Sequence, residues 1–202
     1  MKFDWHVFDP VADRDGNDLT FGWQTIDPPN EVARTGAIAF AIGGKGYFGL
    51  GKSADGEFLK DFWEFTPNEK GTNGTWIKKL DFPGAPRQNA AAFVIGTQGY
   101  VGTGDDIIGD MEGGGYTGQT YSDVYRYDPF NNSWRQIRDY TLDKTENPDN
   151  PKKVTRATGF SRGPKASVGY IGFGMMPEEV LQRAQEDLWE YLPWQTGAAI
   201  YK

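Results

Sequence analysis

The sequence contains no cysteine and only one histidine, His6, among its 202 residues. Without thiols the chain can form no disulfide, thiolate zinc site or cysteine nucleophile. One histidine does not support a zinc site or a Ser–His–Asp triad, so we expect no cofactor. No apolar run approaches the roughly 18 residues that a membrane-spanning helix needs. We also expect no secretion signal, because no apolar segment follows the first residues.

Positive charge is also scarce, since 21 Lys and Arg face 28 Asp and Glu and give a formal net charge of −7. Nucleic acids and anionic membrane surfaces attract clustered Lys and Arg, so we expect neither as a partner. What the sequence does have is 27 Gly, 12 Pro and 15% aromatic residues. This mixture is typical of many short strands joined by tight turns and indicates an all-β chain.

The chain repeats itself. Residues 34–40 and 87–93 both read R-x-x-A-x-A-F, and at the same spacing G-Y-x-G-x-G follows at residues 46–51 and 99–104. A third G-Y-x-G-x-G stands at residues 169–174, after Arg156 and a looser version of the first motif. Such self-similarity indicates a repeat architecture.

Each unit continues in the same way. An Asp-aromatic-Pro segment recurs at residues 61–67, 123–129 and 187–193, and a tryptophan strand follows the first two at Trp76 and Trp134. Residues 4–10 and 22–26 resemble these last two segments. We therefore predict units of four short strands, named A to D in chain order. The predicted limits are a partial unit with strands C and D plus a link (1–33) and full units at 34–86, 87–155 and 156–202.

These linked motifs resemble kelch repeats, in the style of bacterial proteins described as galactose oxidase-like. The resemblance implies a kelch-type β-propeller, in which four-stranded antiparallel sheets, the blades, pack face to face. One departure is that Gly-x-Gly replaces the double glycine usual at the end of kelch strand B. Galactose oxidase needs a cysteine joined to a tyrosine and two histidine ligands for copper. Copper-radical oxidation is therefore excluded, although other enzyme activity stays open.

The number of units is small for a ring. Propellers close with about four to eight blades, and the resemblance implies six or seven. We predict a partial propeller, about half of such a ring, completed by further blades of the same or another chain. One alternative is a small four-bladed ring, in which residues 196–201 form a strand A beside the N-terminal strands C and D.

Strand direction predicts where a site would lie. If strands A to D alternate in direction, the B–C loops and D–A links emerge together on one face, which we call the loop face. The long insertions at 52–60, 105–122, 139–155 and 175–186 all fall there, whereas 11–21 does not. Elaborated loops on a rigid scaffold often carry recognition.

Three arginines begin the predicted A strands, which line the central axis: Arg34, Arg87 and Arg156. At the channel mouth they would bind a carboxylate or a sulfate. The alternative is structural, with each arginine paired to an aspartate or a backbone carbonyl. Two loop aromatics, Tyr116 and Tyr121, are candidates for stacking on a sugar ring.

The loop after residue 104 is rich in carboxylates and glycine. Calcium takes oxygen ligands from flexible loops of this kind, and the weak metal candidates are Asp105, Asp106, Asp110 and Glu112. The loop lacks the register of an EF-hand, so a solvated acidic loop is the alternative.

Three functional hypotheses follow. The first is a non-catalytic binding or scaffold propeller that recognises a glycan or a protein partner through the loop face. The second is a carbohydrate-modifying enzyme, similar to the kelch proteins that interconvert sialic acid anomers. The third is a structural subunit that completes a propeller with another chain. The resemblance further implies a bacterial protein of the periplasm or cell surface.

Overall fold

The computed structural model describes residues 5–9, 23–30, 32–68, 73–109, 117–137, 139–140, 153–162, 168–175, 188–191 and 199–200. All regular structure in these ranges is β-strand. The described ranges hold no helix of the length and apolarity that a membrane crossing requires. The prediction of an all-β chain is confirmed.

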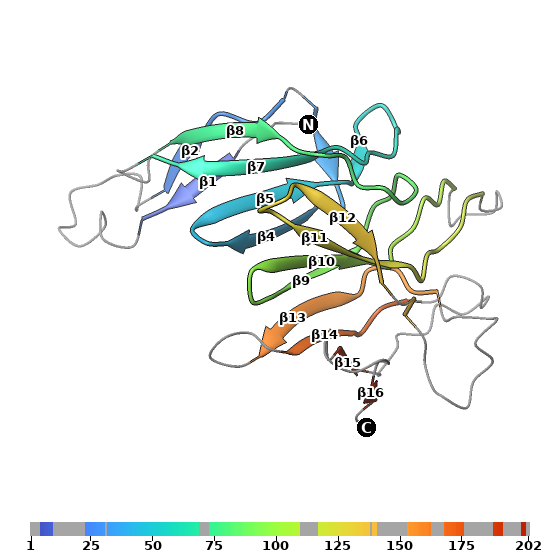
Figure 1. Cartoon of the computed structure of the whole chain (residues 1–202). Helices are drawn as coiled ribbons and strands as arrows, with labels where there is room; N and C mark the ends of the chain where they lie inside the picture. Colours follow the sequence, from blue (N-terminus) through green and yellow to red (C-terminus); the bar gives the residue numbers. More distant parts are fainter. Residues whose placement is uncertain are drawn as a thin grey trace.

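Three antiparallel sheets of four strands follow one another along the chain (Figure 1). Blade one contains β4 (Ile38–Ile42), β5 (Lys45–Gly49), β7 (Phe62–Pro67) and β8 (Gly74–Lys78). Blade two contains β9 (Ala91–Ile95), β10 (Gln98–Gly102), β11 (Val124–Asp128) and β12 (Ser133–Gln136). Blade three contains β13 (Thr158–Arg162), β14 (Val168–Gly172), β15 (Leu188–Tyr191) and β16 (Ala199–Ile200). Strands pair in chain order in every blade, as predicted for positions A to D.

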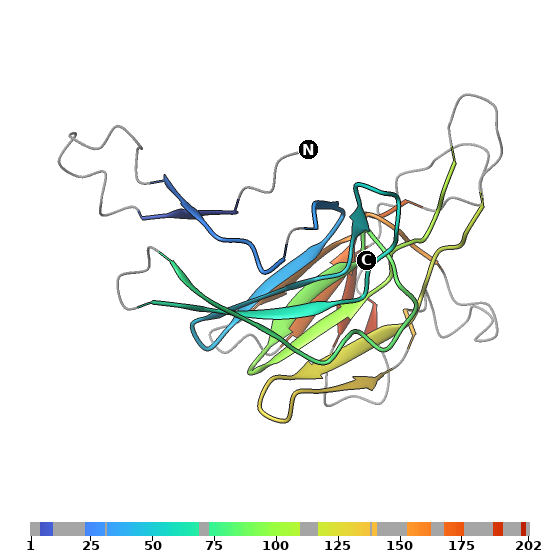
Figure 2. The same ribbon diagram turned by 90° about the horizontal axis from the view of Figure 1, so that it is seen from above.

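Two smaller sheets complete the fold. An N-terminal hairpin of β1 (Trp5–Phe8) and β2 (Trp23–Ile26) takes the places of strands C and D in a preceding blade. A short pair, β3 (Arg34–Thr35) with β6 (Lys52–Ser53), lies between the start of strand A and the end of strand B in blade one. The A–B turns of blades one and two lie at one end of these blades, and their strands B end at the other (Figures 1 and 2).

The last strand decides against the four-bladed alternative. β16 pairs antiparallel with β15, with Ile200 opposite Trp189. It is therefore strand D of blade three and does not lie beside β1 and β2 as a strand A.

Blades pack by inserting an aromatic ring of one strand A against a glycine of the next strand B. A Cβ atom at Gly99 would lie 2.4 Å from the ring of Phe40, and one at Gly169 would lie 2.1 Å from the ring of Phe93. No side chain fits at such distances, so the glycine of each G-Y-x-G motif makes room for the preceding blade.

A tryptophan of strand D connects blade one, and another connects blade two, to the unit before it. The Trp76 indole N–H donates to the carbonyl of Asp27 at 2.8 Å, and that of Trp134 donates to the carbonyl of Leu80 at 3.0 Å. Both side chains are half-buried, and an indole N–H in such a position usually finds a hydrogen-bond acceptor, which accounts for the tryptophan in both blades. The ring of Trp5 lies 4.6 Å from that of Phe48, so the N-terminal hairpin packs on blade one.

Candidate functional site

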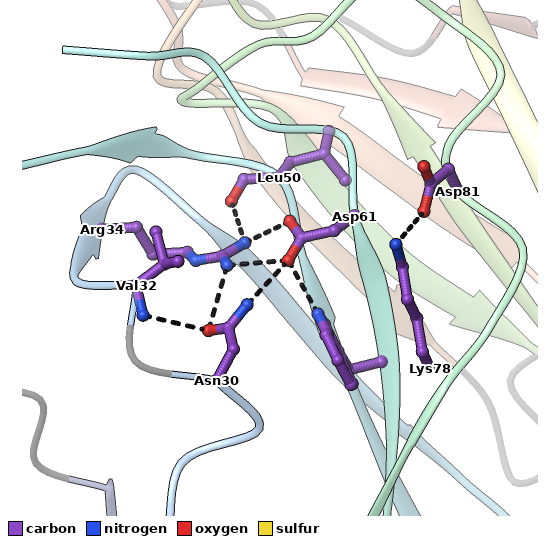
Figure 3. A network of polar contacts seen from close by, with 8 residues as sticks. Asn30, Val32, Arg34, Leu50, Asp61, Lys78 and Asp81 are labelled. Carbon is purple, nitrogen blue, oxygen red and sulfur yellow. Dashed lines mark hydrogen bonds and ion pairs between the residues drawn. The ribbon is translucent and has the colours of Figure 1, made fainter. Parts of the chain in front are cut away.

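Arg34 and Asp61 form a bidentate ion pair at the loop face (Figure 3). Nη1 of the arginine donates to Oδ1 of Asp61 at 2.5 Å, and Nη2 donates to Oδ2 at 2.8 Å. Nη1 also donates to the carbonyl of Leu50 at 3.1 Å. The arginine thus ties the starts of strands A and C to the end of strand B. Its side chain is only 3% exposed.

The carboxylate of Asp61 is held ionised. Burial alone would raise its pKa, but hydrogen bonds from Arg34, from the indole of Trp63 and from the amide of Asn30 outweigh burial and keep the pKa below its ordinary value. The Trp63 bond measures 2.7 Å and the Asn30 bond 3.2 Å. Asp61 is therefore a structural residue whose ionised carboxylate is bound by neighbouring side chains of the protein.

Arg87 repeats the arrangement in blade two and is fully buried. Its two Nη atoms donate to the two carboxylate oxygens of Asp123. Nη1 also donates to the carbonyl of Thr103 at 3.1 Å. The guanidinium lies 3.8 Å from the ring centroid of Tyr121 and 5.0 Å from that of Phe82. Arg34 and Arg87 are thus each paired with an aspartate and a backbone carbonyl, which is the structural alternative to ligand binding.

Tyr121 faces inward onto Arg87, and its hydroxyl donates to Asp106 at 2.7 Å. Burial, followed by this hydrogen bond, raises the pKa of the tyrosine. One ring face is therefore occupied by the guanidinium. Tyr116, the other aromatic candidate, lies outside the described residues.

Arg156 takes a different position from the other two arginines. The amide of Gly51 donates to the carbonyl of Arg87, and the amide of Gly104 donates to that of Val154, so Val154 is the counterpart of Arg87. Arg156 instead continues a second series, because its amide donates to Asn89, whose amide donates to Gly36. All three residues have a left-handed backbone, with φ of 62° at Gly36, 57° at Asn89 and 56° at Arg156.

The side chain of Arg156 is exposed, and the contact described for it is a 3.8 Å approach of Nη1 to the sulfur of Met175. Its neighbours in the series are smaller and half-buried. Among the three predicted arginines, Arg156 is thus the one that presents its guanidinium to solvent at the start of a strand A.

Asp105 is a buried carboxylate with all of its acceptor positions used. One oxygen accepts from the amide of Gln88 at 3.0 Å and from the backbone of Ile107 at 3.1 Å. The other accepts from the amide of Asn89 at 3.0 Å and from the hydroxyl of Thr155. Because Thr155 precedes Arg156, this aspartate links blade two to the start of blade three.

The metal candidates do not form a ligand cluster where they are described. Asp106 accepts from the backbone of Gln119 at 2.6 Å and from the Tyr121 hydroxyl. Within the described ranges, no group of three or more His, Cys, Asp or Glu side chains is placed to hold a metal ion. Asp110 and Glu112 lie outside the described residues.

Sequence reasoning did not name several residues that organise this face: Asp61, Asp123, Asn89, Gln88 and Thr155. Asp61 and Asp123 could have been found from the sequence, because each begins the repeated segment that forms strand C. Asn89 and Thr155 could not have been found in this way. Both bind Asp105, and this contact is not part of a repeated motif.

Part of the chain is similar in sequence to known proteins. An N-acetylneuraminate epimerase of Yersinia enterocolitica is 31% identical over 93 residues, which are 45% of this chain and 21% of that protein. A kelch domain-containing protein of Vibrio cholerae is 34% identical over 96 residues, which are 48% of this chain and 24% of that protein. The four-stranded units are kelch-type propeller blades. No protein-family model matches the chain.

The kelch fold also appears in the comparison with solved structures. The β-propeller titled "Structure of YjhT" superimposes with a TM-score of 0.61 at 18% identity, over 86% of this chain and 52% of that one. At this identity the match concerns the fold alone. The chain spans about half the length of that structure, and its matches cover less than a quarter of the curated relatives named above.

Proposed function

We propose that this chain belongs to a binding propeller that recognises an acidic sugar through its carboxylate at the loop face. Arg156 is the observation that carries the proposal. It is an exposed arginine in the backbone series that Gly36 and Asn89 occupy in the other blades. A guanidinium matches a carboxylate with two parallel hydrogen bonds, which gives both strength and orientation.

The other charged groups described above for this face are already engaged. Arg34 and Arg87 are paired with Asp61 and Asp123, and Asp105 has four neutral donors. A ligand carboxylate that approached these groups would compete with a buried ion pair, which is costly to open. Arg156 has no such commitment to a carboxylate among the described residues.

The backbone at Arg156 adds support. A left-handed φ is easy for glycine and tolerated by asparagine, but it is unfavourable for arginine by roughly 1–2 kcal/mol. The same conformation occurs at this position in blades one, two and three. An arginine there therefore costs free energy that a glycine would not. Side chains retained against such a cost are candidates for function.

The choice of an acidic sugar rests on the relatives. Several are named N-acetylneuraminate epimerase, and N-acetylneuraminate carries a carboxylate of the kind that Arg156 would bind. We propose a glycan ligand in preference to a protein partner on this ground, in a bacterial periplasm or at a cell surface.

The proposal is tested by ligand-observed NMR with N-acetylneuraminate, comparing the parent chain with Arg156→Ala. The matched control is Arg162→Ala, which removes an exposed arginine from the far end of β13, the strand that Arg156 precedes. We expect Arg156→Ala to weaken binding at least tenfold and Arg162→Ala to leave it unchanged. Equal loss in both variants, or binding of a protein partner only, would refute the proposal.

A second candidate function is interconversion of sialic acid anomers, which the names of the relatives favour. It requires proton transfer at the sugar, and Asp105 is poorly suited as a base because its oxygens are occupied. Anomer equilibration of N-acetylneuraminate followed by NMR separates the two functions. Acceleration by catalytic amounts of chain, lost in Arg156→Ala, would favour the enzyme over the binding propeller.

A further inference from the structure

Blade two carries two arginines on the face that it turns toward blade three. Arg126 of β11 lies directly opposite Arg135 of β12, and Tyr100 of β10 lies opposite Arg126 on its other side. Directly paired residues share one face of a sheet, so these three side chains form a row across the blade. The ring of Tyr191 from blade three lies 5.3 Å from that of Tyr100. The row therefore lies between the two blades.

The two guanidinium groups have no carboxylate partner in the part of the chain that the structure describes. The ion pairs there involve neither of them. Asp128 stands two residues after Arg126, but its oxygens accept from the Phe130 amide at 3.0 Å and from the Asn131 side chain at 2.8 Å. Like charges directly opposite each other on neighbouring strands destabilise a sheet, so an anion at this row would stabilise it.

The row at the same place in blade one contains its own anion. Glu64 is only 4% exposed. It accepts from the hydroxyl of Tyr47 at 2.8 Å and from Nζ of Lys45 at 2.7 Å, and Nζ of Lys79 lies 3.5 Å away. Blade one thus surrounds a carboxylate with a phenol and cations. The matching residues of blades one and two are Tyr47 and Tyr100, Glu64 and Arg126, and Ile77 and Arg135.

Two phenol hydroxyls lie near the arginines of blade two. Burial raises the pKa of Tyr100 to about 12, although its hydrogen bond with Arg126 acts in the opposite direction. Burial also raises the pKa of Tyr191, and the charges of Arg126 and Arg135 oppose it. Both hydroxyls therefore stay protonated at neutral pH and can donate. Arg126 is half-buried, whereas Arg135 is exposed on the edge strand β12, so the row is open to solvent at that edge.

We propose that the two arginines and the hydroxyls of Tyr100 and Tyr191 bind a tetrahedral oxyanion, a phosphate or sulfate group, between blades two and three. Two guanidinium forks and two hydroxyls offer more donors than the about four acceptor positions of a carboxylate can use. Two positive charges also match a dianion. The bound group takes the place beside Tyr100 that the Glu64 carboxylate has beside Tyr47. The site shares no residue with the proposed sugar site at Arg156 and does not depend on it.

The proposal is tested on the full chain with inorganic phosphate and inorganic sulfate as probes, by titration calorimetry and thermal denaturation. Chloride keeps the ionic strength constant. We expect saturable binding and a rise in Tm of about 3–5 °C at about ten times the dissociation constant. Both anions also stabilise proteins in general because they are excluded from protein surfaces. Only the part of the rise that is lost in the variants therefore reports the site.

Two variants of the row and one control make the result specific. Arg135→Gln removes the exposed cation and should weaken phosphate binding at least about tenfold. Arg126→Glu supplies a carboxylate where blade one has Glu64, so it should abolish phosphate binding and raise the Tm of the phosphate-free chain. If Arg126→Glu does not fold, Arg135→Gln still decides the question. The control is Lys78→Gln, at an exposed lysine of β8 in blade one, which should bind phosphate like the parent chain.

Glycerol phosphate as a further ligand identifies the source of the anion. Binding at least about tenfold tighter than that of inorganic phosphate would support the site and assign the phosphate to a larger ligand. Equal or weaker binding would support the site as one for the free ion. The proposal is overturned if neither inorganic anion binds saturably, if Arg135→Gln binds phosphate as tightly as the parent, or if Lys78→Gln loses as much affinity as Arg135→Gln.

Discussion

The guanidinium of Arg87 lies flat against Tyr121, with 3.8 Å between its central carbon and the ring centroid. The same guanidinium is bonded to both oxygens of Asp123. A tyrosine from a B–C loop is thus packed on an ion pair that belongs to the blade. This contact fixes the base of the loop, and the hydroxyl bond to Asp106 fixes it a second time.

Removal of Asp123 should be strongly destabilising. Asp123→Ala leaves the fully buried Arg87 charge without its partner, and breaking a buried pair in this way costs about 3–5 kcal/mol. Urea denaturation measures the change in the free energy of unfolding. Asp55→Ala, at an exposed aspartate, is the control and should change stability by less than about 0.5 kcal/mol. Equal effects of the two substitutions would contradict the structural role of the pair.

Acid should weaken the fold through Asp61 and Glu64. Burial opposes ionisation of both, but hydrogen bonds from Arg34 to Asp61 and from Lys45 and Tyr47 to Glu64 hold both pKa values below their ordinary range. Because the folded pKa values are lowered, this stabilisation is complete above the unfolded values near about 4 and is lost as the pH falls through the folded values. Denaturation midpoints between neutral pH and pH of about 3 should show this loss. Asp61→Asn should flatten the profile, and a curve parallel to the parent's would argue against the assignment.

Filling a blade socket should destabilise the chain. Gly99→Ala places a methyl group 2.4 Å from the ring of Phe40, and overpacking of this kind costs about 1–3 kcal/mol. Gly46→Ala, at the equivalent glycine of blade one, should be nearly neutral, because a Cβ atom there would lie at an ordinary 3.6 Å from the Cβ of Phe65. Thermal denaturation of the two variants measures the difference, and equal Tm values would show that the sockets do not set the blade spacing.

Arg156 should show a conflict between stability and function. Arg156→Gly relieves the left-handed backbone and should stabilise the fold by roughly 0.5–1 kcal/mol, while it removes the guanidinium that the proposed ligand binds. Urea denaturation and sugar titration on the same sample test both effects. A destabilised variant, or one that binds the sugar as well as the parent, would count against this account of the residue.

Much of the fold could be predicted from the sequence, because the repeated motifs report contacts that recur from one blade to another. The glycine of G-Y-x-G is a socket, the tryptophan of strand D is a donor to the preceding blade, and the aspartate of strand C receives an arginine. These positions keep their residue types because backbone spacing and buried charge allow few substitutes. The antiparallel order of the strands then followed from the order of the motifs.

The register of Arg156 could not be predicted in the same way. Its place in the chain suggested a third member of the Arg34 and Arg87 series, but Val154 holds that place in the hydrogen-bond ladder. The series to which Arg156 belongs consists of Gly36, Asn89 and Arg156, which share a backbone conformation and no side-chain chemistry. Residues that share only a backbone dihedral angle, and not a side-chain type, are hard to recognise as equivalent from the sequence.

Titration of N-acetylneuraminate and of its methyl ester tests the central proposal most directly, because esterification removes the negative charge that Arg156 is proposed to bind and otherwise adds only a methyl group. We predict saturable binding of the acid and at least about tenfold weaker binding of the ester, as expected for loss of a charge-assisted bidentate contact. Arg156→Ala should bind the two ligands equally weakly. Equal affinity of the parent chain for acid and ester would contradict a carboxylate site at Arg156.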